Sequence, residues 1–363
     1  MSQKPAPSVG VQIVRGIVIA LGLLIVVFFF LIPARSHPPR SVVIYAAQDQ
    51  VYAEPILREF ERGTGIKVKA VYDSEAVKTV GLANRLLAER SHPQCDVFWG
   101  NEEMRTRQLA AQGVFRETNG WAAFGQRSRR IVINTNFISE RRPPTRLDGE
   151  TLQKRAGSEI GAPASLLELT NEVWRGKIAL AFPQFGTTTT HFHALCQLWG
   201  EERWLAWCRA LAANKPFIVD GNSVVVKFVA RGEAWIGLTD SDDIAAGQRE
   251  GLPIAALPLT EESLLIPNTV AVIRNAPHPA NAQRLFEYLQ RREVVEKLVQ
   301  ANALESTDTG RRRGDESQIE KKLETPHVVS YEGKELSALK PDWDALLRGL
   351  ETTTEQLNQI FLR

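Results

Sequence analysis

The chain has 363 residues, of which 44% are hydrophobic, and it carries 44 Lys and Arg against 42 Asp and Glu. This length and hydrophobic content exclude a disordered chain and are typical of two globular units with a sizeable core. The nearly balanced charge lacks the basic excess of nucleic-acid-binding proteins, so we expect no nucleic-acid partner.

The first 40 residues differ from the rest of the chain. An uncharged apolar run covers residues 16–32, after Lys4 and Arg15, and a helix of that length spans about 26 Å of hydrocarbon. The run is longer than the core of an ordinary signal peptide, and the following PARSHPPR is a poor cleavage site. We therefore predict a membrane anchor and linker over residues 1–40, with a cleaved signal peptide as the alternative, and a periplasmic location for the remainder.

From residue 41 onward, short β-rich runs alternate with amphipathic helical patterns, which is typical of an open α/β sheet. A strand over 41–47, a helix closed by Gly63 and Gly65, and a strand over 66–72 come first. A helix over about 75–90, a strand over 95–99 and a helix through Leu109 follow. Further strands are expected over residues 177–182, 217–220, 234–238 and 254–259.

Polar residues directly follow five of these expected strands. They are Gln48 and Asp49, then Asn101 and Glu102, then Thr187 and Thr188, then Asn222, and finally Asp240, Asp242 and Asp243. Ligands of open α/β sheets bind beyond the carboxyl ends of the strands. A charged, loop-rich stretch between residues 139 and 176 separates the first two clusters from the other three, which predicts two α/β lobes with a ligand between them.

Helix capping is an alternative explanation for every one of these clusters, because Asp, Asn, Ser and Thr oxygens accept hydrogen bonds from the free amides at helix starts. The run GTTTTHF (residues 186–192) is either such a cap or an anion site at a helix N-terminus. Arg127 and Arg129, expected just before a strand and on one side of it, could donate to the same anion. The sequence alone leaves these alternatives open.

The chain lacks the motifs G-x-S-x-G, H-E-x-x-H, Walker A and G-x-G-x-x-G, so we predict a binding protein with no catalytic residues rather than an enzyme. Its three cysteines, Cys95, Cys196 and Cys208, leave open a single disulfide between Cys196 and Cys208.

Several long stretches resemble bacterial extracellular solute-binding proteins of the ferric-iron-type ABC transporter class. They are residues 44–115, RSRRIVINTN (127–136), WRGKIALAFPQFGTTTTH (174–191), residues 220–243 and residues 266–289. The resemblance implies a type II-like two-lobed clamshell with two crossover strands. Residues 41–137 and 265–363 would form one lobe, and residues 138–264 the other. It also implies a monomer that delivers a small solute to the permease and ATPase of an ABC importer; an anchored solute sensor and an enzyme on the same scaffold are the alternatives.

This chain departs from the class at the ligand. Iron-binding members carry two adjacent tyrosines where this chain has Asp242 and Asp243, and their first-loop histidine is matched by Asp49. The acidic ligand after the third strand falls at about Asn101, with Glu102 beside it. Carboxylates also bind hard cations, so the metal candidates are Asp49, Glu102, Asp242 and Asp243.

The anion contacts of the class are better preserved than its metal ligands. They correspond to Arg127 or Arg129, Thr187 and Asn222. Acidic groups at one end of the site and Arg, Thr and Asn at the other are compatible with Fe³⁺ and a synergistic anion. They are equally compatible with a small charged solute.

Overall fold

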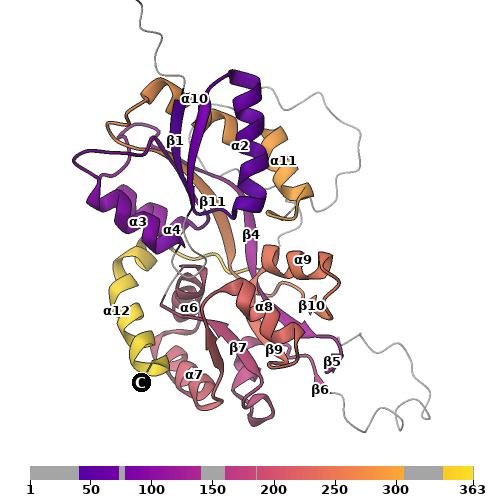
Figure 1. Cartoon of the computed structure of the whole chain (residues 1–363). Helices are drawn as coiled ribbons and strands as arrows, with labels where there is room; N and C mark the ends of the chain where they lie inside the picture. The colour runs from indigo at the N-terminus through magenta and orange to yellow at the C-terminus, as the bar shows by residue number, and fades with distance from the viewer. Residues whose placement is uncertain (1–40, 73–77, 140–159, 185, 306–337, 363) are drawn as a thin grey trace, which may run out of the picture. The chain divides into compact units, whose positions relative to one another are not determined.

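The computed structural model describes residues 41–362 apart from 73–77, 140–159, 185 and 306–337 (Figure 1). These residues belong to one compact unit, Ser41–Arg363. The anchor and linker predicted over residues 1–40 lie outside the described residues. Within the described ranges, no helix is both long and apolar enough to cross a membrane.

Strands and helices alternate along the first part of the chain, as the sequence predicts. They are β1 (Ser41–Ala46), α2 (Gln50–Thr64), β2 (Lys67–Tyr72), α3 (Lys78–Ala88), β3 (Val97–Gly100), α4 (Glu103–Ala111) and β4 (Trp121–Asn134). Two short strands and two 3-10 turns come next: β5 (Ile138–Ser139), β6 (Ile160–Gly161), η1 (Leu166–Thr170) and η2 (Glu172–Trp174).

The second part of the chain continues the alternation before the chain returns to the first strands. Its elements are β7 (Ile178–Ala181), α6 (Gly186–Trp199), α7 (Glu201–Ala213), β8 (Phe217–Val219), α8 (Asn222–Ala230), β9 (Ile236–Asp240), α9 (Ser241–Arg249) and β10 (Ile254–Ala256). The last elements are β11 (Leu265–Val272), α10 (Pro279–Leu289), α11 (Arg292–Gln300) and α12 (Trp343–Phe361).

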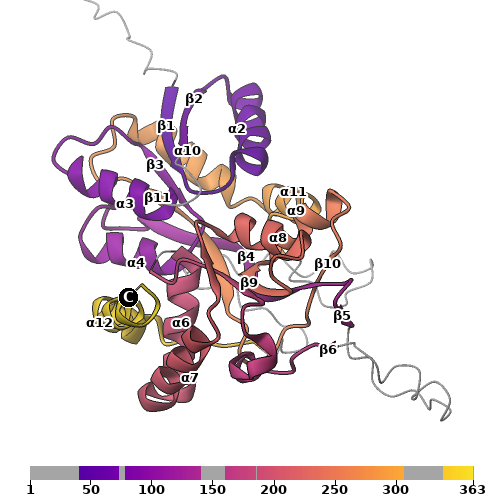
Figure 2. The same ribbon diagram turned by 60° about the horizontal axis from the view of Figure 1, so that its bottom comes forward.

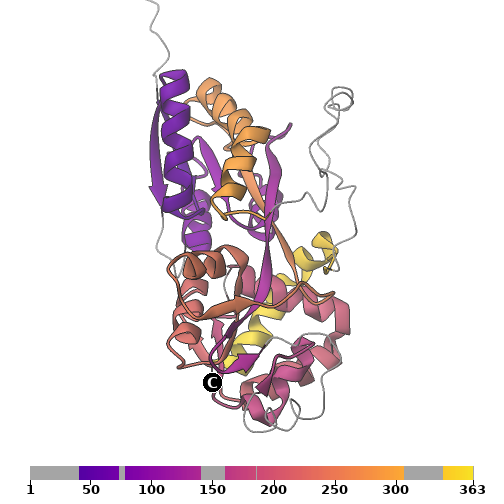
Figure 3. The ribbon, with the colours of Figure 1, turned by 90° about the vertical axis from the view of Figure 1, so that its right-hand side faces the viewer.

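One sheet has the strand order β2-β1-β3-β11-β4-β9-β7-β8, and β10 pairs with β4. The 14-residue strand β4 pairs with β11 along its first half, and with β9 and β10 along its second half. Figure 3 shows β4 running from the elements around β1 and α2 to those around α8 and α9. β4 and β11 are thus the two crossover strands of the α/β two-lobed fold that the sequence predicts.

Two strand boundaries that we expected from the sequence were wrong. Arg127 and Arg129 lie inside β4 rather than before a strand, and Asp240 closes β9 instead of following it. The cause is pairing across the sheet, since Arg129 lies opposite Asp240 in the register of β4 and β9. Charged residues normally indicate a loop, but a buried charge is tolerated within a strand when its partner lies beside it.

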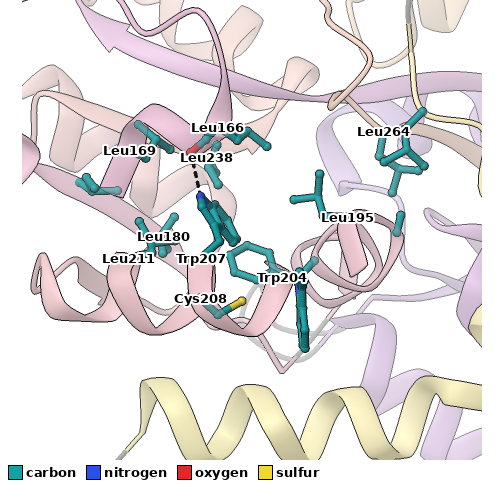
Figure 4. Packing of buried hydrophobic residues seen from close by; sticks show 14 of the residues in the cluster. Leu166, Leu169, Leu180, Leu195, Trp204, Trp207, Cys208, Leu211, Leu238 and Leu264 are labelled. Atoms are coloured by element: carbon teal, nitrogen blue, oxygen red, sulfur yellow. Dashed lines mark hydrogen bonds between the residues drawn. The ribbon is translucent and has the colours of Figure 1, made fainter. Parts of the chain in front are cut away.

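Buried apolar side chains around α6, α7, β7 and β9 form the core next to the second group of strands (Figure 4). The indole N–H of Trp207 donates to the carbonyl of Leu166 at 2.9 Å, which ties α7 to η1. Cys208 belongs to this core, and Cys95, Cys196 and Cys208 all carry free thiols. The Cys196–Cys208 disulfide that the sequence left open is therefore not formed, and burial raises the pKa of both thiols.

The C-terminal helix α12 packs against α4, α6 and α7 (Figure 2). Its buried residues Leu346, Leu350 and Leu357 belong to the core around α6 and α7. Arg107 of α4 contacts Asp344 of α12 at 3.3 Å. The helix thus contacts elements on both sides of the predicted lobe boundary, and the division into lobes remains a prediction.

Gly237 in β9 leaves no room for a side chain between β9 and α8. A methyl group there would lie 2.4 Å from Cγ1 of Val225 and 3.1 Å from the carbonyl oxygen of Ala179. We expect Gly237→Ala to lower the free energy of unfolding by about 1–3 kcal/mol, because overpacking forces neighbouring atoms to move. Urea denaturation measures this loss.

Gly63→Ala in α2 is the matched control, because the added methyl group meets no atom within 4 Å. It should raise the free energy of unfolding by about 0.5–1 kcal/mol, since alanine favours the helix. Equal losses at the two glycines would contradict the packing argument.

Candidate functional site

Most of the polar residues at the carboxyl ends of the strands are buried, and Arg127 and Arg129 link several of them in one charged network. Those that are at most 5% exposed are Gln48, Asn101, Glu102, Arg127, Arg129, Thr187, Thr188, Asp240 and Asp242. Asp49, Asn222 and Asp243 are partly buried beside them. Such burial requires each charge to have a partner.

Arg129 joins the residues that close or follow β7, β8 and β9. Its Nη1 donates to Asp240 Oδ1 at 2.7 Å and to Asn222 Oδ1 at 2.8 Å, and lies 3.4 Å from Thr187 Oγ1. Thr187 and Asn222 both donate in turn to Asp240 Oδ2, at 3.0 and 3.1 Å. Because Thr187 and Asn222 lie in the first turns of α6 and α8, two helix N-termini approach the same guanidinium.

Arg127 joins the loop after β3 to α9. Its Nη1 donates to Asp242 Oδ2 at 2.7 Å, and its Nη2 donates to the carbonyl of Asn101 at 3.1 Å. Nη2 also lies 3.2 Å from Asp240 Oδ2. The two carboxylates that begin α9 are therefore engaged by guanidinium groups, and the side chain of Asp240 makes no capping hydrogen bond although Asp240 is the N-cap of that helix.

The two buried aspartates differ in their protonation. Burial raises the pKa of Asp242 to about 6, and the neighbouring carboxylates of Asp240 and Asp49 add to this rise against the effect of Arg127. Burial also acts on Asp240, but the guanidinium groups of Arg127 and Arg129 outweigh it and hold the pKa of Asp240 below its usual value. Asp240 is thus a permanent anion at neutral pH, whereas Asp242 titrates close to neutrality.

Glu102 has the geometry of a helix cap. Its carboxylate accepts hydrogen bonds from the backbone amides of Met104 at 2.8 Å and Arg105 at 3.0 Å, at the start of α4. Thr190 of α6 lies 3.3 Å from the same carboxylate. The capping alternative therefore accounts for Glu102, while Asp240 and Asp242 pair with arginines.

Glu102→Ala should lower the free energy of unfolding by about 1 kcal/mol, as expected for a lost N-cap, and leave solute affinity within about three-fold of the wild type. Urea denaturation and calorimetric titration measure the two effects. Asp342→Ala is the control, because Asp342 caps α12 in the same way by accepting from the amides of Asp344 and Ala345. A much larger loss of affinity in Glu102→Ala would identify Glu102 as a ligand.

Three further polar residues, outside this charged network, were missed in the sequence. Arg249 of α9 donates to the hydroxyl of Tyr52 in α2 at 2.7 Å, and Asn268 of β11 donates to Gln48 Oε1 at 2.7 Å. A signal for Asn268 was present, since a lone amide within the apolar strand LIPNTVAV is unusual for a buried strand. Tyr52 and Arg249 carry no comparable signal, because Tyr52 belongs to the buried face of α2 and a basic residue is common in the last turn of a helix.

Several nitrogen and oxygen atoms of the network have no hydrogen-bond partner within the described ranges. They are Nε of Arg127, Nε and Nη2 of Arg129, and Oδ1 of Asp242. Donors outnumber acceptors in this set, and buried groups of this kind are normally paired. Nε and Nη2 of Arg129 form one edge of its planar guanidinium group. This edge is a bidentate donor that matches two oxygens of a carboxylate or phosphate.

Known proteins with similar sequences bind iron. The major ferric iron-binding protein of Neisseria gonorrhoeae is 24% identical over 288 residues, which are 72% of this chain and 79% of that protein. Its counterpart in Neisseria meningitidis serogroup A is 27% identical over 212 residues, 53% of this chain. The chain spans only 56% of the length of that relative.

Solved structures show the same fold. Iron-bound HitA from Pseudomonas aeruginosa aligns with a TM-score of 0.67 at 18% identity, covering 87% of this chain and 99% of HitA. AfuA from Actinobacillus pleuropneumoniae, with fructose-6-phosphate bound, aligns with a TM-score of 0.60 at 21% identity, covering 73% and 83% of the two chains. The two neighbours hold chemically different solutes on one scaffold.

The sequence profile of one family matches residues 42–301, well over half of the chain. That family consists of binding proteins, which agrees with the absence of enzyme motifs from the sequence. The chain therefore belongs to the family of bacterial extracellular solute-binding proteins.

Proposed function

We propose that this chain is the solute-binding component of an ABC importer and captures a small anionic solute between its two lobes. The observation that carries the proposal is the buried head of Arg129, whose Nε and Nη2 have no partner among the described residues. The neighbours of Arg129 in the network, Thr187 and Asn222, lie at helix N-termini, where the helix dipole and free amides favour negative charge. Delivery to a membrane permease and its ATPase is the role that the family resemblance implies, with the receptor acting as a monomer.

Ferric iron with an accompanying anion is the second candidate. It is favoured by the iron-binding relatives and by Asp240, Asp242 and Asp243, whose ligand oxygens lie within 4.8 Å of one another. Carboxylate oxygens are suitable ligands for a hard cation.

Arg127 opposes this second candidate, because its guanidinium contacts both Asp240 and Asp242. A metal ion would therefore have to displace this guanidinium group before both carboxylates could coordinate it. The hydroxyl of the nearby Tyr52 accepts a hydrogen bond from Arg249 at 2.7 Å, and burial raises the pKa of Tyr52. The pairing of Asp240 and Asp242 with guanidinium groups thus favours an anion over a bare metal ion.

Thermal unfolding and calorimetric titration of residues 41–363 test the proposal. We expect phosphate monoesters or small carboxylates to raise the melting temperature and bind saturably, whereas ferric nitrilotriacetate should have little effect. Arg129→Met should abolish the anion response, and Arg231→Met, at an arginine whose side chain is 68% exposed, should retain it. Ferric binding that survives Arg129→Met would favour the second candidate, and failure of every probe would contradict both.

A further inference from the structure

We infer that the solute carries a hydroxyl or carboxamide group beside its anionic group, and that the side-chain amides of Gln48 and Asn268 recognise it. The inference rests on the proposed function and narrows the class of solute. Neither amide belongs to the charged network around Arg127 and Arg129. The role of the amide pair is therefore separate from anion binding.

The amide pair lies at the same edge of the sheet as Arg127. Gln48 follows β1, and Asn268 lies in β11 at the register shift between Pro267 and Thr269. Because β3 separates β1 from β11 in the sheet, the 2.7 Å hydrogen bond from Asn268 Nδ2 to Gln48 Oε1 spans the carboxyl end of β3. Asn101 lies at that end and gives its carbonyl to Arg127.

Each amide keeps one hydrogen-bonding atom unused. Gln48 is 1% exposed and Asn268 is fully buried, and Gln48 Nε2 and Asn268 Oδ1 lack a partner among the described residues. Rotating both side-chain amides by 180° would exchange their nitrogen and oxygen positions. It would still leave one NH₂ group and one carbonyl oxygen without a partner. The pair therefore offers one donor and one acceptor in either orientation.

Few chemical groups satisfy a donor and an acceptor at once. Ionised carboxylate oxygens and the oxygens of a fully ionised phosphate monoester only accept, and an ammonium group only donates. A hydroxyl or a carboxamide does both, and a site built to hydrogen-bond such a group rejects analogues that lack it. The solute that fits both parts of the site is a hydroxylated or amidated organic anion, not an unsubstituted carboxylate.

Matched pairs of probes test the inference by calorimetric titration of residues 41–363, which form one compact unit. The pairs are glycerol 3-phosphate with propyl phosphate, lactate with propionate, and succinamate with levulinate. The first two pairs differ in hydroxyl groups, and the third replaces an amide NH₂ by a methyl group. We expect the hydroxyl or amide member to bind at least about ten-fold more tightly in one or more pairs.

Gln48→Met and Asn268→Leu should each reduce this preference to less than about three-fold while the weaker member of the pair binds as before. Asn281→Leu is the matched control, because Asn281 is also a buried amide but donates to the carbonyl of Ser41 at the other end of β1. Gln48→Met keeps the test valid if Asn268→Leu does not fold, since Gln48 lies outside the strands.

The outcomes separate the inference from the proposed function. Equal affinity within every pair, or a preference that survives Gln48→Met, would overturn the inference and leave anion binding intact. Failure of all six probes to bind would overturn the proposed function as well.

Discussion

Replacing Arg129 with Met should abolish binding of the anionic solute and lower the free energy of unfolding by about 3–5 kcal/mol. The side chains of Arg129 and Asp240 are 0% and 1% exposed, and removing Arg129 leaves the buried Asp240 carboxylate with only the partial compensation of Arg127 at 3.2 Å. Urea denaturation gives the stability change, and calorimetric titration gives the affinity.

A double variant separates the structural part of this effect from the binding part. In Arg129→Met/Asp240→Asn no uncompensated carboxylate remains, so at least half of the lost stability should return while binding remains absent. Recovery of solute affinity in the double variant would show that Arg129 serves only to neutralise Asp240.

Asp242→Asn should gain stability relative to the wild type as the pH rises. The pKa of Asp242 in the folded protein is about 6, above its ordinary value of 3.8. The folded state therefore holds this proton more tightly, and the stability that protonation contributes is lost as the pH rises through about 6. Between pH 4 and pH 7 the difference in free energy of unfolding should move in favour of the variant by up to about 3 kcal/mol.

Urea denaturation of both proteins at pH 4, 5, 6 and 7 measures this difference. Asp344→Asn is the control, because the side chain of Asp344 is 74% exposed and surface substitutions change stability by about 0.5 kcal/mol or less. A difference between Asp242→Asn and wild type that does not vary with pH would contradict the assignment of Asp242 as the titrating carboxyl.

The periodic pattern of the sequence was sufficient to predict how strands and helices alternate along the chain. The rule that ligands bind beyond the carboxyl ends of strands identified most residues of the network. Asn101, Thr187, Asn222 and Asp240 were all found in this way, because residues after parallel strands must meet at one edge of the sheet. The same rule could not distinguish capping from pairing. That distinction depends on which side chains meet across the fold, as when Arg127 reaches Asp242, which is 115 positions further along the chain.

Other features depended on tertiary contacts that leave little trace in the sequence. Asn268 was missed although its amide stands out in the apolar strand around it, because its partner Gln48 is 220 positions away in the chain. The extent of β4 was misjudged because its arginines look like loop residues until their cross-strand partners are known. The position of α12 against α4, α6 and α7 likewise follows from packing rather than from its own helical pattern.

Native mass spectrometry of the chain, purified from bacterial cells without denaturation, tests most directly whether Arg129 holds a small organic anion. The wild type should carry an adduct with the mass of such an anion, which should persist in Arg231→Met and be absent from Arg129→Met. An adduct with the mass of a metal ion alone, or identical adducts on the wild type and Arg129→Met, would contradict the account.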